Sequence, residues 1–317
     1  MIRRRRLIGA VVPELSGIAQ RSQEGVVAKP ALQSLDAESI YDPTVLVHVL
    51  TTVAAGAVAG TLGALLGLGG GVFLVPFLNL AMGLPLPTAS GISLVTVIAT
   101  SSVVSASSRR LRVANLRLGM FLEVFTAFGA ALGGTIVYEI AESTRREVFG
   151  ATLALIALIM IRRLDKRNVI KDPSVDVGVF GGRYHEDESG GEVAYRVKRV
   201  PLACIMATLA GVLSTLAGIG GGVIKVPVLN TWCGVPIRVS AATSGLMIGA
   251  TAMIGAAVYF QHGDVPYELA AGAVLGVLFG SRLGLHFAER SRARHHKIIL
   301  ASVLAAVAMA YFIQAQR

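Results

Sequence analysis

The chain has 317 residues, of which 54% are hydrophobic and only 15% are charged, and its mean hydropathy is +0.67. Soluble proteins carry about 25% charged residues, so the composition excludes an ordinary soluble enzyme and indicates a protein that lies mostly in a lipid bilayer. The net charge of +10 at pH 7 does not indicate a nucleic-acid partner, because the basic residues lie between apolar runs, as in the loops of membrane proteins.

The first 43 residues are polar and are interrupted by prolines and glycines. We expect an N-terminal extension over 1–43 that is soluble or lies on the membrane surface. A cleaved signal peptide is the alternative, since Arg3–Arg6 precede a short apolar run, but Pro13 and Glu14 end that run early.

Ten apolar runs follow, five before and five after a polar stretch at 162–199. Several approach the roughly 20 residues that a helix needs to span a bilayer, whereas 72–84 and 223–235 are shorter and contain a proline. The runs are 44–66, 72–84, 87–108, 118–138, 147–161, 200–217, 223–235, 239–260, 267–285 and 298–315. We therefore predict an all-α, multi-pass transmembrane protein with two membrane regions, 44–161 and 200–315, joined by a cytoplasmic linker at 162–199.

The two membrane regions are copies of one unit. Residues 59–79 (AGTLGALLGLGGGVFLVPFLN) and 210–230 (AGVLSTLAGIGGGVIKVPVLN) are identical at 13 of 21 positions, at a constant offset of 151 without a gap. The same register relates Ser93 to Ser244. A match of this length indicates a duplicated membrane unit.

The basic loops indicate how the two halves face. Placing the loop at 109–117, the linker and the loop at 286–297 on the cytoplasmic side satisfies the positive-inside rule for the short loops. This assignment requires inverted repeats of five segments each, and it puts the N-terminal arginines outside. A parallel arrangement moves the N terminus inside but moves the basic loop at 286–297 outside. Because short loops next to helices count for more, we favour inverted repeats.

In each half an apolar helix runs into a glycine triplet and then into a short segment with an internal proline. The triplets are Gly69-Gly70-Gly71 and Gly220-Gly221-Gly222. Glycines weaken a helix, and open backbone inside a bilayer is tolerated only where protein shields it or where it lines a watery cavity. Repeated interrupted segments point to the midplane site of a transporter, where the N terminus of a short helix favours an anion. The alternative is that the glycines only allow close packing of helices.

Ionisable residues inside apolar runs are candidates for function because they are costly to bury. Lys225 follows the second triplet, where its cation adds to the anion preference of the helix end. The alternative is a lysine that extends to the lipid headgroups. Arg238 either closes over the same site or lies at the interface. Arg282 is either a clamp for the substrate or the partner of Glu123 in a structural ion pair.

Neutral side chains near the triplets suit hydrogen bonds to an anion, although each is also a candidate for interhelical hydrogen bonding. These are Asn79, Ser93, Asn230, Thr243 and Ser244. We expect no cofactor and no metal, because the two cysteines, Cys204 and Cys233, lie in apolar stretches. We expect His48, His262 and His286, near segment ends, to be interfacial, with proton coupling as the alternative.

Two copies of G-x-G-G-G-x-x-x-V-P, each followed by Gly-x-Pro and then by an A-x-x-S or A-T-S stretch, resemble the sulfite exporter TauE/SafE family, also called the toluene-sulfonate uptake permeases. The resemblance covers most of 44–315; the N-terminal extension and the long linker go beyond the family's usual core. It implies a multi-pass permease for small sulfur-containing or organic anions, such as sulfite, sulfoacetate or taurine-derived products. By position, it also implies that the glycine triplets, Pro76, Pro227 and the regions of Ser93 and Ser244 form the shared core.

We therefore expect a secondary transporter of small anions in the inner cell membrane, with alternating access to a site at the paired breaks. The expected partners are the bilayer, a proton or sodium ion for coupling, and a second copy in a homodimer. A passive anion channel and a permease for small carboxylates are the alternatives. We do not expect an enzyme, because the apolar runs contain no nucleophile–base pair, no H-E-x-x-H motif and no paired carboxylates.

Overall fold

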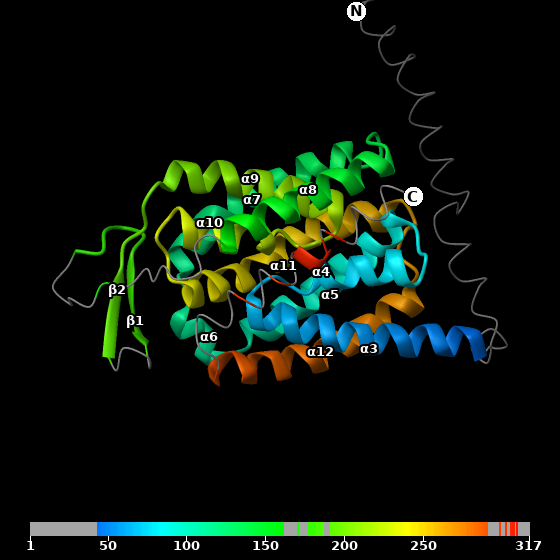
Figure 1. Ribbon diagram of the computed structural model, residues 1–317, viewed down its shortest axis with the longest axis horizontal. Helices are drawn as coiled ribbons and strands as arrows, with labels where there is room; N and C mark the ends of the chain where they lie inside the picture. Colours follow the sequence, from blue (N-terminus) through cyan, green and yellow to red (C-terminus); the bar gives the residue numbers. More distant parts are fainter. Residues whose placement is uncertain are drawn as a thin grey trace, which may run out of the picture. The chain divides into compact units, whose positions relative to one another are not determined.

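The computed structural model describes residues 43–161, 170, 176–186, 191–290, 298, 302, 305–307 and 309 (Figure 1). The N-terminal extension up to residue 42 and most of the last apolar run lie outside the described residues. Nearly all of the described residues belong to one compact unit, which begins at Val49.

Helices form both membrane regions. The first region contains α3 (Pro43–Leu66), α4 (Gly71–Pro76), the π-helix η2 (Phe77–Ala81), α5 (Leu86–Ser105), α6 (Ser108–Val113), α7 (Leu116–Ile136) and α8 (Glu142–Ile161). The second contains α9 (Val200–Ala217), α10 (Gly222–Thr231), α11 (Ile237–Gln261) and α12 (Tyr267–Arg290). Within the described residues, six of these helices are long and apolar enough to cross a membrane, namely α3, α5, α7, α9, α11 and α12. This confirms the predicted all-α, multi-pass membrane fold.

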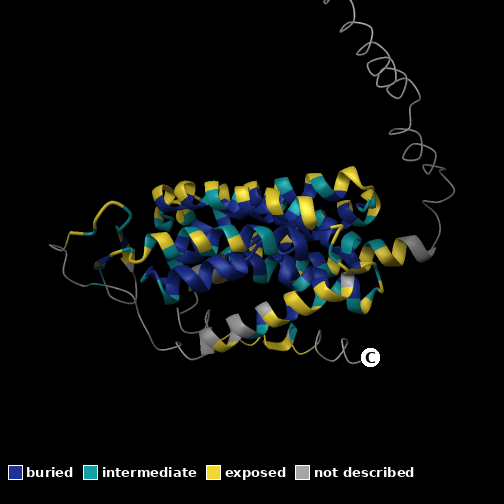
Figure 2. Cartoon of the chain, turned by 90° about the horizontal axis from the view of Figure 1, so that it is seen from above, coloured by how far each residue is buried: buried dark blue, intermediate teal, exposed yellow. Residues whose placement is uncertain are grey.

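The central helices are α5 and α11, which pack on each other in the middle of the bundle. They are also the most buried of the six, with 61% and 67% of their apolar windows inside the protein. Exposed residues lie on the outer faces of the surrounding helices (Figure 2). Many of these residues have large apolar side chains, including Phe128 on α7 and Phe279 on α12, as expected of helices that face lipid.

The helix boundaries repeat with the offset of the sequence. The helices α10, α11 and α12 each begin 151 residues after α4, α5 and α7, and α9 ends 151 residues after α3. The halves also exchange helices through small-residue contacts. A Cβ atom on Gly280 of α12 would lie 1.9 Å from the carbonyl oxygen of Ala57 on α3, and one on Gly211 of α9 would lie 2.0 Å from that of Thr126 on α7. The first helix of each half therefore packs on a helix of the other half: α3 packs on α12, and α9 packs on α7, the equivalent of α12.

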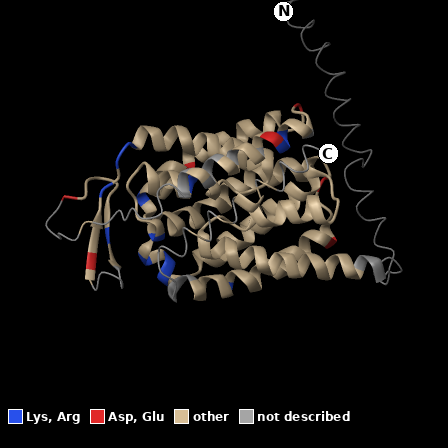
Figure 3. Cartoon of the chain, viewed as in Figure 1, with Lys and Arg blue, Asp and Glu red and all other residues tan. Residues whose placement is uncertain are grey.

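The equivalent helices α3 and α9 run in opposite directions in Figure 1. Figure 3 shows most lysines and arginines at the end of the bundle that carries α6, whereas the opposite end carries acidic residues together with a smaller basic group. Both observations agree with inverted repeats and with a cytoplasmic α6 end. The inverted arrangement and the side of the linker stay predictions.

The linker contains a feature that the sequence analysis did not predict, an antiparallel hairpin of β1 (Gly182–Glu186) and β2 (Gly191–Tyr195). Asn115, at the N-cap of α7, holds this hairpin to the bundle. Its Nδ2 atom donates to the Phe180 carbonyl oxygen (2.7 Å) and to the Tyr195 hydroxyl oxygen (2.9 Å). Burial raises the pKa of Tyr195 and the bond from Asn115 opposes that shift, so the phenol is neutral at physiological pH.

Candidate functional site

Each of the helices α3 and α9 ends in a glycine break that turns the chain into a short helix. In the first break Gly69 and Gly70 have φ angles of 83° and 81°, and in the second Gly220 and Gly221 have φ angles of 78° and 67°. Two successive left-handed residues are strained for any residue with a side chain. The backbone turn itself therefore requires the glycines, in addition to any role in helix packing.

The two breaks lie directly against each other. A Cβ atom on Gly71 would lie 2.8 Å from the carbonyl oxygen of Gly218, and one on Gly222 would lie 2.7 Å from that of Gly67. The start of each short helix thus faces the carbonyl end of the long helix from the other half. Because helix N termini carry partial positive charge and C termini partial negative charge, these ends neutralise each other. In this arrangement the start of each short helix is buried against the other half.

An apolar pair, Val97 on α5 and Ile248 on α11, lies beside both breaks. The two residues occupy equivalent positions in the halves, and both are fully buried. A Cβ atom on Gly69 would lie 2.7 Å from Ile248 Cδ1 and 2.9 Å from Val97 Cγ1, and one on Gly220 would lie 2.7 Å from Val97 Cγ1. This pair was not predicted from the sequence, although the offset of 151 relates the two positions.

Of the predicted hydroxyl residues, Ser93 and Ser244 lie at the breaks, whereas Thr243 contacts the start of α7. Ser93 donates a hydrogen bond of 2.6 Å to the Gly218 carbonyl oxygen. Its counterpart Ser244 is fully buried, and its hydroxyl group has no hydrogen-bond partner in the described part of the chain. The Thr243 hydroxyl oxygen accepts a hydrogen bond from the backbone N–H of Asn115 at the N-cap of α7 (2.9 Å). Of the three predicted hydroxyl residues, Ser244 is thus the one whose hydroxyl group makes no hydrogen bond to the described residues.

We expect Ser93→Ala to destabilise the protein, because it leaves the buried carbonyl group of Gly218 without its donor. The loss of stability should be about 1–3 kcal/mol, measured by chemical unfolding in mixed micelles. Ser102→Ala is the matched control on the same helix, since the exposed Ser102 donates only to the Ile98 carbonyl oxygen of its own turn. Equal losses in both variants would contradict a specific role for the contact between the halves.

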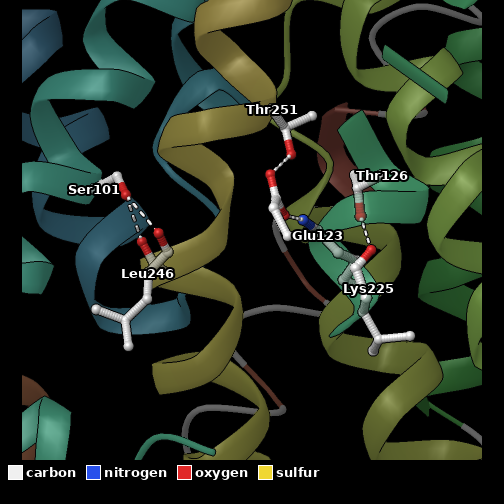
Figure 4. A network of polar contacts seen from close by, with 8 residues as sticks. Ser101, Glu123, Thr126, Lys225, Leu246 and Thr251 are labelled. Atoms are coloured by element: carbon white, nitrogen blue, oxygen red, sulfur yellow. Dashed lines mark hydrogen bonds and ion pairs between the residues drawn. The ribbon is translucent and has the colours of Figure 1, made fainter. Parts of the chain in front are cut away.

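A buried charged network lies next to the second break (Figure 4). Lys225 is 2% exposed, and its Nζ atom lies 3.3 Å from Glu123 Oε2 on α7. Thr251 on α11 donates a hydrogen bond of 2.6 Å to Glu123 Oε1. The Lys225 side chain therefore does not extend to the headgroups, and the partner of Glu123 is Lys225 and not Arg282. Since a Cβ atom on Gly221 would lie 3.6 Å from Lys225 Cε, the cation is held close to the break.

The other predicted site residues do not meet at the breaks. The side-chain amides of Asn79 and Asn230 donate to Leu84 O (2.8 Å) and Val235 O (2.9 Å), so both asparagines fasten the loop that follows their short helix. Arg238 is half-buried at the start of α11, and Arg282 is exposed on α12. No group of three or more metal-ligating side chains occurs among the described residues.

Comparisons with known proteins agree with this architecture. The sequence profile of the family described as sulfite exporter TauE/SafE matches residues 52–311. The probable membrane transporter protein YunE of Bacillus subtilis is 26% identical over 80% of this chain and 93% of its own length. The probable membrane transporter protein MJ0441 of Methanocaldococcus jannaschii is 23% identical over 78% and 90%. Sulfite exporter TauE/SafE family protein 6 of Arabidopsis thaliana is 34% identical over 33% of this chain and 24% of its own length. No solved structure matches.

Proposed function

This chain belongs to the sulfite exporter TauE/SafE family, and on that basis we propose that it is a secondary transporter of small sulfur-containing anions such as sulfite, sulfoacetate or other sulfonates. Its relatives are named membrane transporters, and the six candidate spans among the described residues make it a multi-pass membrane protein. The single observation that carries the proposal is the reciprocal packing of two glycine breaks beside a buried lysine. We further propose the inner cell membrane as its location.

The proposed mechanism is alternating access by separation of the two halves. Separation uncovers the N termini of the short helices and the hydroxyl group of Ser244, which suit an anion. In the closed arrangement Glu123 compensates the charge of Lys225, and in the loaded state the substrate anion takes over part of that role. The apolar pair Val97 and Ile248 keeps water and ions from leaking through the closed breaks. A proton or sodium gradient supplies the driving force.

A passive anion channel and a permease for small carboxylates are the alternatives to this proposal. A channel conducts only down the gradient of its ion, whereas a secondary transporter saturates and accumulates substrate against that gradient. A carboxylate permease shares the same cationic site but prefers acetate-like anions. Competition between sulfite and carboxylates for transport therefore distinguishes a carboxylate permease from a transporter of sulfur-containing anions.

The test uses the full chain reconstituted in proteoliposomes. We expect saturable uptake or release of sulfite that a proton or sodium gradient drives uphill and that acetate inhibits weakly. Lys225→Ala should abolish this flux. It should also reduce the thermal stabilisation that sulfite gives the detergent-solubilised protein. Non-saturable flux without accumulation would favour the channel. Stronger inhibition by carboxylates than expected would favour a permease for small carboxylates.

A further inference from the structure

A small cavity lies between α8 of the first half and the end of α9 in the second. Its volume is about 50 Å³, and its walls include Thr144, Arg145, Leu213, Ala217 and Ile219. A cavity holds one water molecule when roughly 10–15 Å³ of its space is open to the centre of a water-sized sphere, which is the measure used for this volume. The space therefore suits a group of a few heavy atoms, which is the size of sulfite and not that of an aromatic sulfonate.

Arg145 is the charged residue in the wall of this cavity. It is only 7% exposed, and its Nε and Nη1 atoms have no hydrogen-bond partner in the described part of the chain. The guanidinium group interacts with Tyr259 of α11 through its charge and a side-chain hydrogen bond, and the Tyr259 hydroxyl group donates to the Thr215 carbonyl oxygen (2.8 Å). A buried cation is costly unless it is paired, and arginine binds oxyanions through several donors at once. The unpaired donors beside a cavity of this size thus call for a small oxyanion.

The cavity is next to the second glycine break. Ala217 and Ile219 in its wall flank Gly218, whose carbonyl oxygen abuts the first residue of α4. Arg145 lies in the first turn of α8, which begins at Glu142, and this start of α8 is at the end of the bundle opposite α6 (Figure 1). At this end Tyr138 of the α7–α8 loop donates a hydrogen bond to Asp264 of the α11–α12 loop. An anion bound in the cavity would therefore lie toward the end of the bundle opposite α6. It would also be close to the second glycine break, because the cavity wall includes both neighbours of Gly218.

We propose that Arg145 forms a capture site for a small oxyanion, reached from the membrane side opposite α6 and leading to the second glycine break. This inference rests on the proposed function, since it assigns the step that precedes binding between the breaks. Arg145 binds the anion, and the mouth formed by Thr144 admits it. The site selects by size, because its other walls are mostly apolar side chains.

The test measures binding of sulfite to the full chain in detergent by thermal shift and by titration calorimetry. Arg145→Gln should weaken binding by about tenfold or more, as expected for loss of a charge-assisted hydrogen bond. Arg145→Lys should retain part of the affinity because it keeps the charge. Leu213→Trp should weaken binding by filling the cavity while Arg145 stays in place. Arg146→Gln is the matched control, since this neighbour is half-buried, does not line the cavity and has interactions of its own.

The outcomes separate this inference from the proposed function. Wild-type sulfite affinity in Arg145→Gln would overturn the capture site, even if the protein transports sulfite. Binding that depends on Arg145, without any transport by the wild type, would support the site and sink the proposed function. Folding is controlled by the melting temperature without ligand, and Arg145→Lys and Leu213→Trp keep the test decisive if Arg145→Gln does not fold.

The side of access is tested by labelling with a membrane-impermeant maleimide. Cys204 and Cys233 are first replaced by alanine, and Thr144→Cys then places one thiol at the exposed mouth of the cavity. We expect labelling from the side opposite the linker, and labelling only from the linker side would overturn the proposed route.

Discussion

Gly222→Ala is expected to abolish transport and to destabilise the closed protein. Its Cβ atom would lie 2.7 Å from the carbonyl oxygen of Gly67 and 3.0 Å from the Cα atom of Leu68. Both neighbours are backbone atoms, so the two halves must move apart to accommodate one methyl group. Overpacking of this kind costs typically about 1–3 kcal/mol. Because the closed arrangement is one of the states of alternating access, the variant should lose flux as well as stability, measured by sulfite transport and chemical unfolding.

The control for this prediction is Gly119→Ala on α7. There a Cβ atom would meet side-chain atoms of Thr243 and Met247 at 3.1 Å or more, and such atoms can give way. Gly71→Ala, the counterpart of Gly222→Ala in the first half, should behave like it, since its Cβ atom would lie 2.8 Å from the Gly218 carbonyl oxygen. Normal transport by both triplet variants would show that the breaks need not close on each other.

The helices and their repeat could be predicted from the sequence because both depend on local pattern. Apolar runs and the offset of 151 carry this information without any knowledge of packing. The glycine breaks could be placed for the same reason. Their mutual contact could not, because it arises only when α5 and α11 bring the two halves together. The roles of Asn79 and Asn230 could not be predicted either, because the sequence does not distinguish an asparagine that bonds to a loop carbonyl group from one that binds a ligand.

The partners of the charged residues were the least predictable part of the site. Glu123 and Lys225 are 102 residues apart, and the exchange of helices between the halves decides that they meet. The sequence offered Arg282 as an equally reasonable partner for Glu123, but α12 turns that side chain outward. Arg145 was missed because it lies in a mixed-charge segment at a helix start, where an arginine usually reads as a loop residue. Only the burial of its guanidinium group distinguishes it.

The pair formed by Lys225 and Glu123 leads to the second large prediction. Lys225→Met leaves the carboxylate of Glu123 in the bundle without its cation, with Thr251 as its remaining donor. Removing one partner of a buried ion pair lowers the free energy of unfolding by about 3–5 kcal/mol. We expect a loss near the smaller of these values, because the Glu123 side chain is 16% exposed. Sulfite transport should be lost as well, since the site then has no lysine cation. Lys198→Met, which removes an exposed lysine before α9, is the control and should change stability by no more than about 0.5 kcal/mol.

The double variant Lys225→Met with Glu123→Gln separates the structural role of the pair from its role in transport. Replacing both charges removes the uncompensated carboxylate, and replacing a buried ion pair by uncharged groups is often neutral for stability. Thr251 can still donate to the glutamine side-chain oxygen. We therefore expect stability close to that of the wild type but no sulfite transport, measured by unfolding in micelles and by flux in proteoliposomes. Recovery of transport together with stability would show that the pair only holds α7 and α10 together, because a substrate site that depends on the Lys225 cation cannot work without it.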